Sequence, residues 1–401
     1  MGKKLSIILI IVLCVCLTSF KIFSKKEEVS TFTFWTIQLK APFGDVIQEN
    51  IDKFKEKHPD INVVWVDIPI TEAQKRAIAA ILGGNPPDLI NLNPEFSSLL
   101  AQKNSLDYFT EEEASLYNKN LVDELRFDGK IYALPFYATS AVTILNKEKF
   151  VNCNLSVKTY DDILKLKACK NPPVFGIALN EGDIFSKILN KYNVSKENLN
   201  KEDLEKTYKL FYDLKNNNLL LKDTLTINHR EAVEKYMAGS AAFTVAGSNF
   251  INMIKENAPS VYKNSIILPQ LTGKNGKYDV SIMNFVIPKE AKNKELAREF
   301  LSILLNEENQ LALSKKTNVL PVNKKVLNNS YFQHCSQDLI DKSRCTAIKQ
   351  LNNPSGLNFG VKNKKEINEV VNKSLEILFL NGEKAFNADD TYQGIKNLIE
   401  N

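Results

Sequence analysis

The sequence is poor in the residues and motifs on which most enzymes depend. It has three histidines among 401 residues, and His58, His229 and His334 lie far apart along the chain. No G-x-x-x-x-G-K-[ST], H-E-x-x-H or G-x-S-x-G motif is present, and no G-x-G-x-x-G follows a strand pattern. Carboxylates are abundant, but no pair stands out as the acid and base of a glycosidase. We therefore expect a protein that is not an enzyme.

Metal-ligand clusters and concentrated positive charge are also lacking. A histidine adjoins a cysteine only at His334–Cys335, so neither a zinc site nor a cofactor is expected. Lysine and arginine number 52 against 47 aspartates and glutamates, and this small excess is spread along the chain. Such a surface does not favour nucleic acid as a partner. The length and the 44% hydrophobic content allow two domains with substantial cores.

The N-terminal residues 1–20 have the pattern of a targeting segment. Lys3 and Lys4 precede an apolar run, residues 5–17, which is short for a membrane span and typical of a secretory signal. Residues 21–30 are charged and polar and would form a tether before the fold. We therefore expect an exported protein at the periplasmic or extracellular face of the membrane.

Processing of this leader stays open. A lipoprotein site requires a small residue before the modified cysteine, whereas Leu13 precedes Cys14 and Val15 precedes Cys16. The sequence is also a poor match to a signal-peptidase site. The mature protein is therefore either released or held at the membrane through residues 5–20.

Four cysteines follow the leader, at Cys153, Cys169, Cys335 and Cys345. They allow three connectivities, and local pairing of Cys153 with Cys169 and of Cys335 with Cys345 is the simplest. Each such disulfide could stabilise the fold by about 3 kcal/mol. Four free thiols are the alternative.

Strand and helix patterns alternate through the first part of the chain. Residues 31–35 alternate as a strand, and residues 43–54 carry apolar side chains at helical spacing. A second strand is expected at residues 61–66 and a third at residues 89–92. This order predicts an α/β protein whose mostly parallel, doubly wound sheet has helices on both faces.

The segment GGNPPDLINLNPEFSSLLAQKNSL, residues 83–106, combines a helix end, a buried strand, a polar loop and a helix. In an open α/β sheet, ligands bind beyond the carboxyl ends of the strands, where Asn93 and Glu95 would lie. This segment resembles the matching one in maltose-binding-protein-like extracellular solute-binding proteins of bacteria, the sugar receptors of ABC importers. Four more segments match that family in order: FTFW (32–35), KHPDINV (57–63), DGKIYALPFY (128–137) and IPKEAKNKELAREFL (287–301).

The resemblance implies a two-lobed periplasmic-binding-protein fold with three crossings between the lobes. The first lobe would contain residues 31–134 and 283–320, and the second would contain residues 135–282 and 321–401. A monomer would close about a hinge on a small polar solute, such as a sugar or short oligosaccharide, and deliver it to a membrane permease.

Sugars present apolar ring faces and hydroxyl groups, so aromatic, amide and carboxylate side chains are the natural ligand-binding candidates. They comprise Trp35, Gln38, Asn93, Glu95, Phe136, Tyr137, Glu181, Asp183, Ser248, Asn249, Met283 and Asn284. Several have structural alternatives. Trp35 can close the sheet, whereas Asn93 and Asp183 can cap helices and Glu95 can favour a helix N-terminus.

This chain departs from the family at two expected stacking positions. Asn249 and Met283 stand where relatives often have tryptophan. The second lobe should therefore offer little ring stacking, which favours a compact and strongly polar solute.

A membrane-tethered receptor domain that signals through a protein partner is the alternative function. A secreted hydrolase is a third interpretation, which the missing motifs disfavour.

Overall fold

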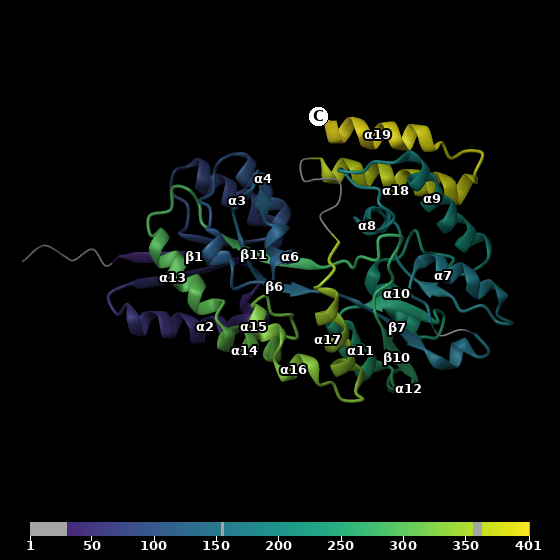
Figure 1. Ribbon diagram of the computed structural model, residues 1–401, viewed down its shortest axis with the longest axis horizontal. Coiled ribbons are helices and arrows are strands. Elements are labelled where there is room, and N and C mark those ends of the chain that lie inside the picture. The colour runs from purple at the N-terminus through teal and green to yellow at the C-terminus, as the bar shows by residue number, and fades with distance from the viewer. Residues whose placement is uncertain (1–29, 154–155, 356–362, 401) are drawn as a thin grey trace, which may run out of the picture.

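The computed structural model describes residues 30–153, 156–355 and 363–400, and the expected leader lies outside these ranges. Two lobes lie side by side, and each is built on its own sheet (Figure 1). Within the described ranges, none of the helices is both long enough and apolar enough to cross a membrane.

The first lobe contains a five-stranded mixed sheet. Its strands, in spatial order, are β2 (Asn62–Ile68), β1 (Thr31–Ile37), β3 (Leu89–Leu92), β11 (Ser281–Val286) and β6 (Leu134–Thr139). β1 pairs in parallel with β2 and β3, whereas β11 runs antiparallel to β3 and β6. The sheet thus begins as predicted and ends in two strands contributed by the crossings between the lobes.

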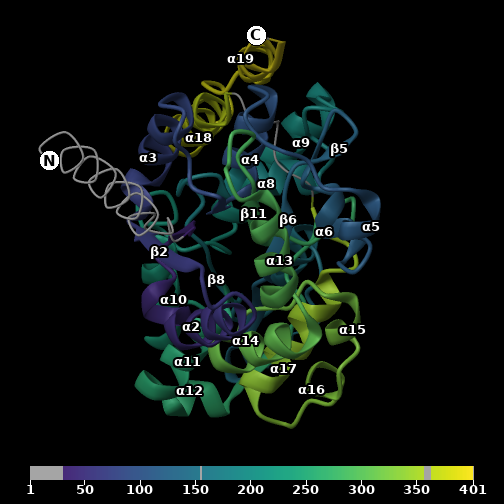
Figure 2. The ribbon, with the colours of Figure 1, turned by 90° about the vertical axis from the view of Figure 1, so that its left-hand side faces the viewer.

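Alternation along β1 divides the first-lobe core into two layers. Phe32 and Phe34 face one side, where their rings contact Phe54 and Phe300. Trp35 faces the other side and packs against a separate apolar cluster. Helices α2 (Lys40–Lys57), α13 (Lys294–Leu304) and α14 (Glu307–Thr317) cover the first side and lie together in Figure 2. Helices α3 (Ile70–Leu82) and α4 (Pro94–Gln102) supply the second cluster.

The second lobe contains a four-stranded sheet that is also mixed. Its order is β10 (Ser265–Leu268), β7 (Val142–Asn146), β9 (Phe243–Ala246) and β8 (Phe175–Gly176). β7 runs antiparallel to both β10 and β9, and only β8 and β9 are parallel. This sheet is therefore less parallel than the strand–helix alternation predicts.

Helices cover both faces of the second sheet. One face is covered by α7 (Tyr160–Lys165), α8 (Ile184–Lys191) and α9 (Lys201–Asn216). On this layer pack α18 (Lys364–Asn381), which contacts α8 and α9, and α19 (Ala388–Glu400), which contacts α9 and α18. The other packs against α10 (His229–Met237), α11 (Ser248–Asn257) and α17 (Leu339–Gln350). The shorter elements are α5 (Glu111–Ala114), α6 (Lys119–Asp123), β4 (Arg126–Phe127), β5 (Lys130–Ile131), η1 (Lys147–Phe150), η2 (Leu166–Ala168), α12 (Pro259–Lys263), α15 (Lys324–Leu327) and α16 (Ser330–Gln333).

The chain leaves the first sheet slightly later than the resemblance implies. β6 continues through Pro135 to Thr139, and Ser140 then leads into β7 of the second lobe. Proline is tolerated here because β6 is an edge strand. Leu320 also stays with the first lobe, since its N–H and C=O both bond the backbone of Ala138. The chain returns to the first sheet at β11.

Two disulfides confirm the predicted local pairing. Cys153 is joined to Cys169, and Cys335 is joined to Cys345. The Cα atoms lie 5.6 Å and 6.3 Å apart, respectively. The second disulfide fastens α17 to the loop that precedes it, and α17 contributes to the site described next.

Candidate functional site

Two adjacent cavities lie between the lobes and together form what we call the cleft. The larger has a volume of about 490 Å³ and the smaller about 240 Å³. Lys187, Asp279 and Ser281 line both cavities, so the two volumes adjoin. Their size is that of a pocket for a small molecule of several rings.

The larger cavity is bounded mainly by the hinge and the second lobe. Residues 139–142 of the first crossing form one wall, and Leu320 contributes from the first lobe. Residues 245–250, at the end of β9 and the start of α11, form another wall. Helix α17 contributes Arg344 to the wall. The guanidinium of Arg344 forms an ion pair with Asp341 at 2.8 Å and packs on the ring of Tyr331.

The start of α11 directs polar groups into this cavity. Ser248 and Asn249 are its first two residues and line the cavity. Gly247 precedes them, and no side chain caps the helix. The N–H groups of the first turn lack intrahelical acceptors, so the wall offers donors to a ligand.

Aromatic side chains also line the larger cavity, although position 249 is not aromatic. His229 and Phe250 meet edge to face, with ring centroids 4.9 Å apart. Burial lowers the pKa of His229, with Glu181 opposing that effect, so the imidazole is neutral near pH 7. Tyr160 adds a third, deeply buried ring. The expectation of little stacking surface in the second lobe therefore overlooks these rings.

The smaller cavity is charged and is lined by both lobes. Asn93 and Glu95 come from the start of α4 in the first lobe, and Asp183 and Lys364 come from the second. Lys364 Nζ lies 3.4 Å from Glu95 and 2.9 Å from Asp183. Burial alone would raise the pKa of Asp183, but Lys187 and Lys364 outweigh it and hold that pKa below its ordinary value.

Six of the twelve predicted residues line the cleft. Ser248 and Asn249 border the larger cavity, whereas Asn93, Glu95, Asp183 and Met283 border the smaller one. Asn93 also caps helix α4, which was its structural alternative, because its Oδ1 accepts a hydrogen bond from Phe96 N at 2.8 Å. Asp183 makes no such cap for α8.

The other six line neither cavity. Trp35 and Phe136 belong to the apolar clusters of the first lobe, and Tyr137 stacks on Phe43. Asn284 is fully buried and donates to Ser97 Oγ at 2.6 Å. Gln38 lies exposed after β1, and Glu181 accepts from His229 N at 2.6 Å.

The cleft also contains residues that the sequence did not single out. They comprise Tyr160, Lys187, His229, Phe250, Asp279, Arg344 and Lys364. Four of them share a usable signal, because Tyr160, His229, Phe250 and Lys364 each lie in the first turn of a helix. Within the described residues, no group of three or more His, Cys, Asp or Glu side chains could hold a metal ion.

Comparison with known proteins agrees with this geometry. Residues 49–336 match the family described as bacterial extracellular solute-binding protein. The diacetylchitobiose binding protein DasA of Streptomyces coelicolor is 24% identical over 327 residues, which cover 74% of each chain. The arabinooligosaccharide-binding protein of Bacillus subtilis is 23% identical over 319 residues, or 71% of each chain.

Solved structures show the same architecture. The sugar-binding protein MalE from Xanthomonas citri matches with a TM-score of 0.74 and 18% identity, over 92% of this chain and 97% of that chain. This similarity confirms the predicted two-lobed fold.

Proposed function

We propose a function on the premise that this chain belongs to the bacterial extracellular solute-binding protein family. It captures a sugar or short oligosaccharide in the cleft and delivers it to the membrane subunits of an ABC importer. The observation that carries this proposal is the pair of adjoining cavities between two lobes. Closure of the lobes on a ligand would bury it and favour the closed state through the additional contacts made there.

The lining suits a saccharide. Hydroxyl groups need donors and acceptors, which Asn93, Asn249 and the start of α11 supply. Apolar ring faces need aromatic or apolar partners, which His229 and Phe250 supply. The two volumes favour a ligand of a few sugar rings.

Several finer features belong to the same proposal. The family is extracellular, and we infer that the mature protein acts as a monomer outside the cell membrane, either free or anchored through residues 5–20. We also infer binding without catalysis, since the relatives are described as binding proteins. Nothing in the structure or the comparisons favours a receptor that signals through a protein partner.

Calorimetric titration of the purified chain tests this function. The probes are diacetylchitobiose, arabino-oligosaccharides and maltodextrins, each oligosaccharide series being graded in length. We expect one site per chain, a higher melting temperature on binding, and an affinity that levels off at short chain lengths. An affinity that rises steadily with length would contradict the compact ligand. Absence of binding to any saccharide, with binding to amino acids or peptides, would contradict the solute class.

A further inference from the structure

We propose that Asp279 is a ligand-binding residue that sets the specificity of the cleft, and that Lys191 is the positioning residue that holds its carboxylate. This inference rests on the proposed function, because it assigns a contact within the same cleft. Asp279 is not part of any motif in the sequence, and its role follows only from where the structure places it.

Asp279 occupies the junction of the two cavities. It lines both of them and stands two residues before β11, on the crossing that returns the chain to the first lobe. Its side chain is 26% exposed. A ligand that spans both cavities must therefore pass this carboxylate.

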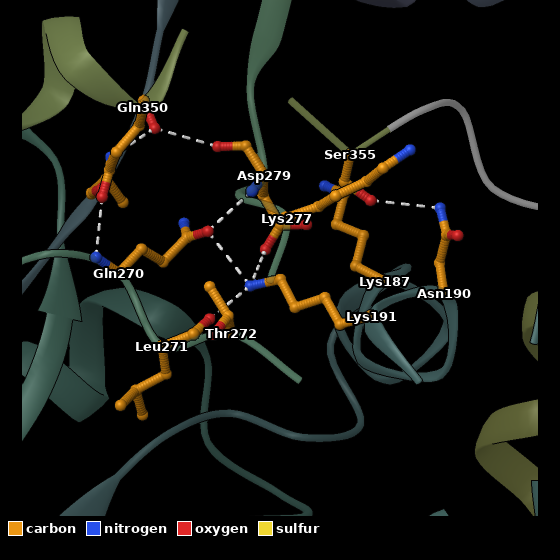
Figure 3. A network of polar contacts seen from close by, with 12 residues as sticks. Lys187, Asn190, Lys191, Gln270, Leu271, Thr272, Lys277, Asp279, Gln350 and Ser355 are labelled. Carbon is orange, nitrogen blue, oxygen red and sulfur yellow. Dashed lines mark hydrogen bonds and ion pairs between the residues drawn. The ribbon is translucent and has the colours of Figure 1, made fainter. Parts of the chain in front are cut away.

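Backbone and side-chain bonds fix the orientation of Asp279 (Figure 3). Its N–H donates to Gln270 Oε1 at 2.6 Å, and its carbonyl accepts from Ser140 Oγ at 3.0 Å. Its Oδ2 lies 2.8 Å from Lys191 Nζ. A carboxylate has about four lone-pair positions, so this ion pair leaves accepting capacity for hydroxyl groups.

Lys191 is suited to positioning because its ammonium cannot reach water. The side chain is 0% exposed, and Nζ also donates to Gln270 Oε1 at 3.0 Å and to Leu271 O at 2.8 Å. Burial lowers the pKa of Lys191, while Asp279 opposes this effect. A buried ammonium is costly unless it is paired in a well-defined geometry, so Lys191 and Asp279 constrain each other.

The same hydrogen-bond network links Asp279 to other segments that connect the two lobes. Gln350, the last residue of α17, accepts from Gln270 N at 2.7 Å. Its Nε2 donates to Ser140 Oγ at 2.7 Å and to Ala141 O at 2.8 Å. Asp279 is thus held against the hinge itself, where a ligand contact can act on both lobes. A fixed carboxylate at this place selects a ligand that presents hydroxyl donors.

The test uses the full mature chain and the probes diacetylchitobiose, arabinotriose and maltotriose. Asp279→Asn should weaken binding of the best of these probes by at least about tenfold, since bonds to a charged acceptor are among the strongest. Asp279→Glu should also weaken it, because the longer side chain cannot keep both the Lys191 pair and its place in the cleft. Wild-type affinity in both variants would overturn the proposal.

Lys191→Met tests the positioning role. It should weaken binding in the wild-type background and cause little further loss in the Asp279→Asn background. A merely structural lysine would instead give the same additional loss in both backgrounds. Lys274→Met is the matched control, because Lys274 pairs with Asp203 at 3.1 Å on the surface of the same lobe. This control should leave affinity unchanged.

Two outcomes separate this inference from the proposed function. If wild type binds no saccharide but binds amino acids or peptides, the proposed function fails and Asp279 loses its assignment with it. If wild type binds and the Asp279 variants bind equally well, only the present inference fails. Should Lys191→Met not fold, Asp279→Glu decides the positioning role, since retained affinity in that variant would overturn it.

Discussion

At the scale of single residues, Tyr137 was expected to bind the ligand from its place at the end of a strand, but its side chain lines neither cavity. Its ring stacks on Phe43 with centroids 5.1 Å apart, and burial raises its pKa to about 12. Tyr137→Ala should lower the free energy of unfolding by about 2–3 kcal/mol, because a large, partly buried side chain that packs against the core is removed. Affinity should stay within about twofold, since the ring lines neither cavity. Urea unfolding and calorimetry measure the two quantities.

Tyr137→Phe is the control, because it keeps the ring stack and should keep nearly all of the stability. A large loss of affinity with unchanged stability in Tyr137→Ala would instead place the side chain in the cleft, as the sequence-based expectation does. Neighbouring Phe136 shows why sequence alone cannot decide this. Alternation along a strand predicts that Phe136 and Tyr137 point to opposite faces of the sheet. It does not predict which of these faces borders the cleft between the lobes.

At the scale of elements, α17 connects a disulfide to the cleft. Cys345 lies in α17 next to Arg344, which lines the larger cavity, and its partner Cys335 lies in the preceding loop. Replacing both cysteines by serine should lower the free energy of unfolding by about 3 kcal/mol. It should also weaken saccharide affinity by roughly threefold, because α17 would hold the wall of the cavity less firmly.

The Cys153–Cys169 disulfide provides the control, since neither cysteine lines the cleft. Its double serine variant should lose a similar amount of stability and keep wild-type affinity. Equal losses of affinity in both double variants would mean that global stability, not the placement of α17, governs binding. Thermal unfolding with and without saccharide separates these effects.

The elements of the first lobe were the most predictable from sequence. Turn residues, apolar periodicity and the cap at Asn93 define β3 and α4 locally. The directions of the second-lobe strands were not predictable, because β7 and β10 pair with partners distant in sequence. For the same reason the cleft was only half predicted: Asp279, Arg344 and Lys364 meet there through tertiary folding rather than through a motif.

At the scale of the whole molecule, the ion pair between Glu95 and Lys364 joins the lobes across the smaller cavity. Glu95 belongs to α4 of the first lobe and Lys364 to α18 of the second, with 3.4 Å between Oε2 and Nζ. Partly exposed pairs of this kind contribute about 0–1 kcal/mol. Glu95→Gln should therefore shift the ligand-free balance toward open lobes by about twofold, and small-angle scattering should detect a larger radius of gyration.

Salt provides an independent check of the same ion pair. Raising the ionic strength should enlarge the ligand-free wild-type protein, because the pair is partly screened, and should leave Glu95→Gln nearly unaffected. Glu72→Gln is the matched control, since Glu72 pairs with Arg76 at 2.7 Å within α3 and joins no lobes. If Glu95→Gln left the ligand-free dimensions unchanged while affinity fell more than about tenfold, Glu95 would be a direct ligand contact rather than a link between lobes.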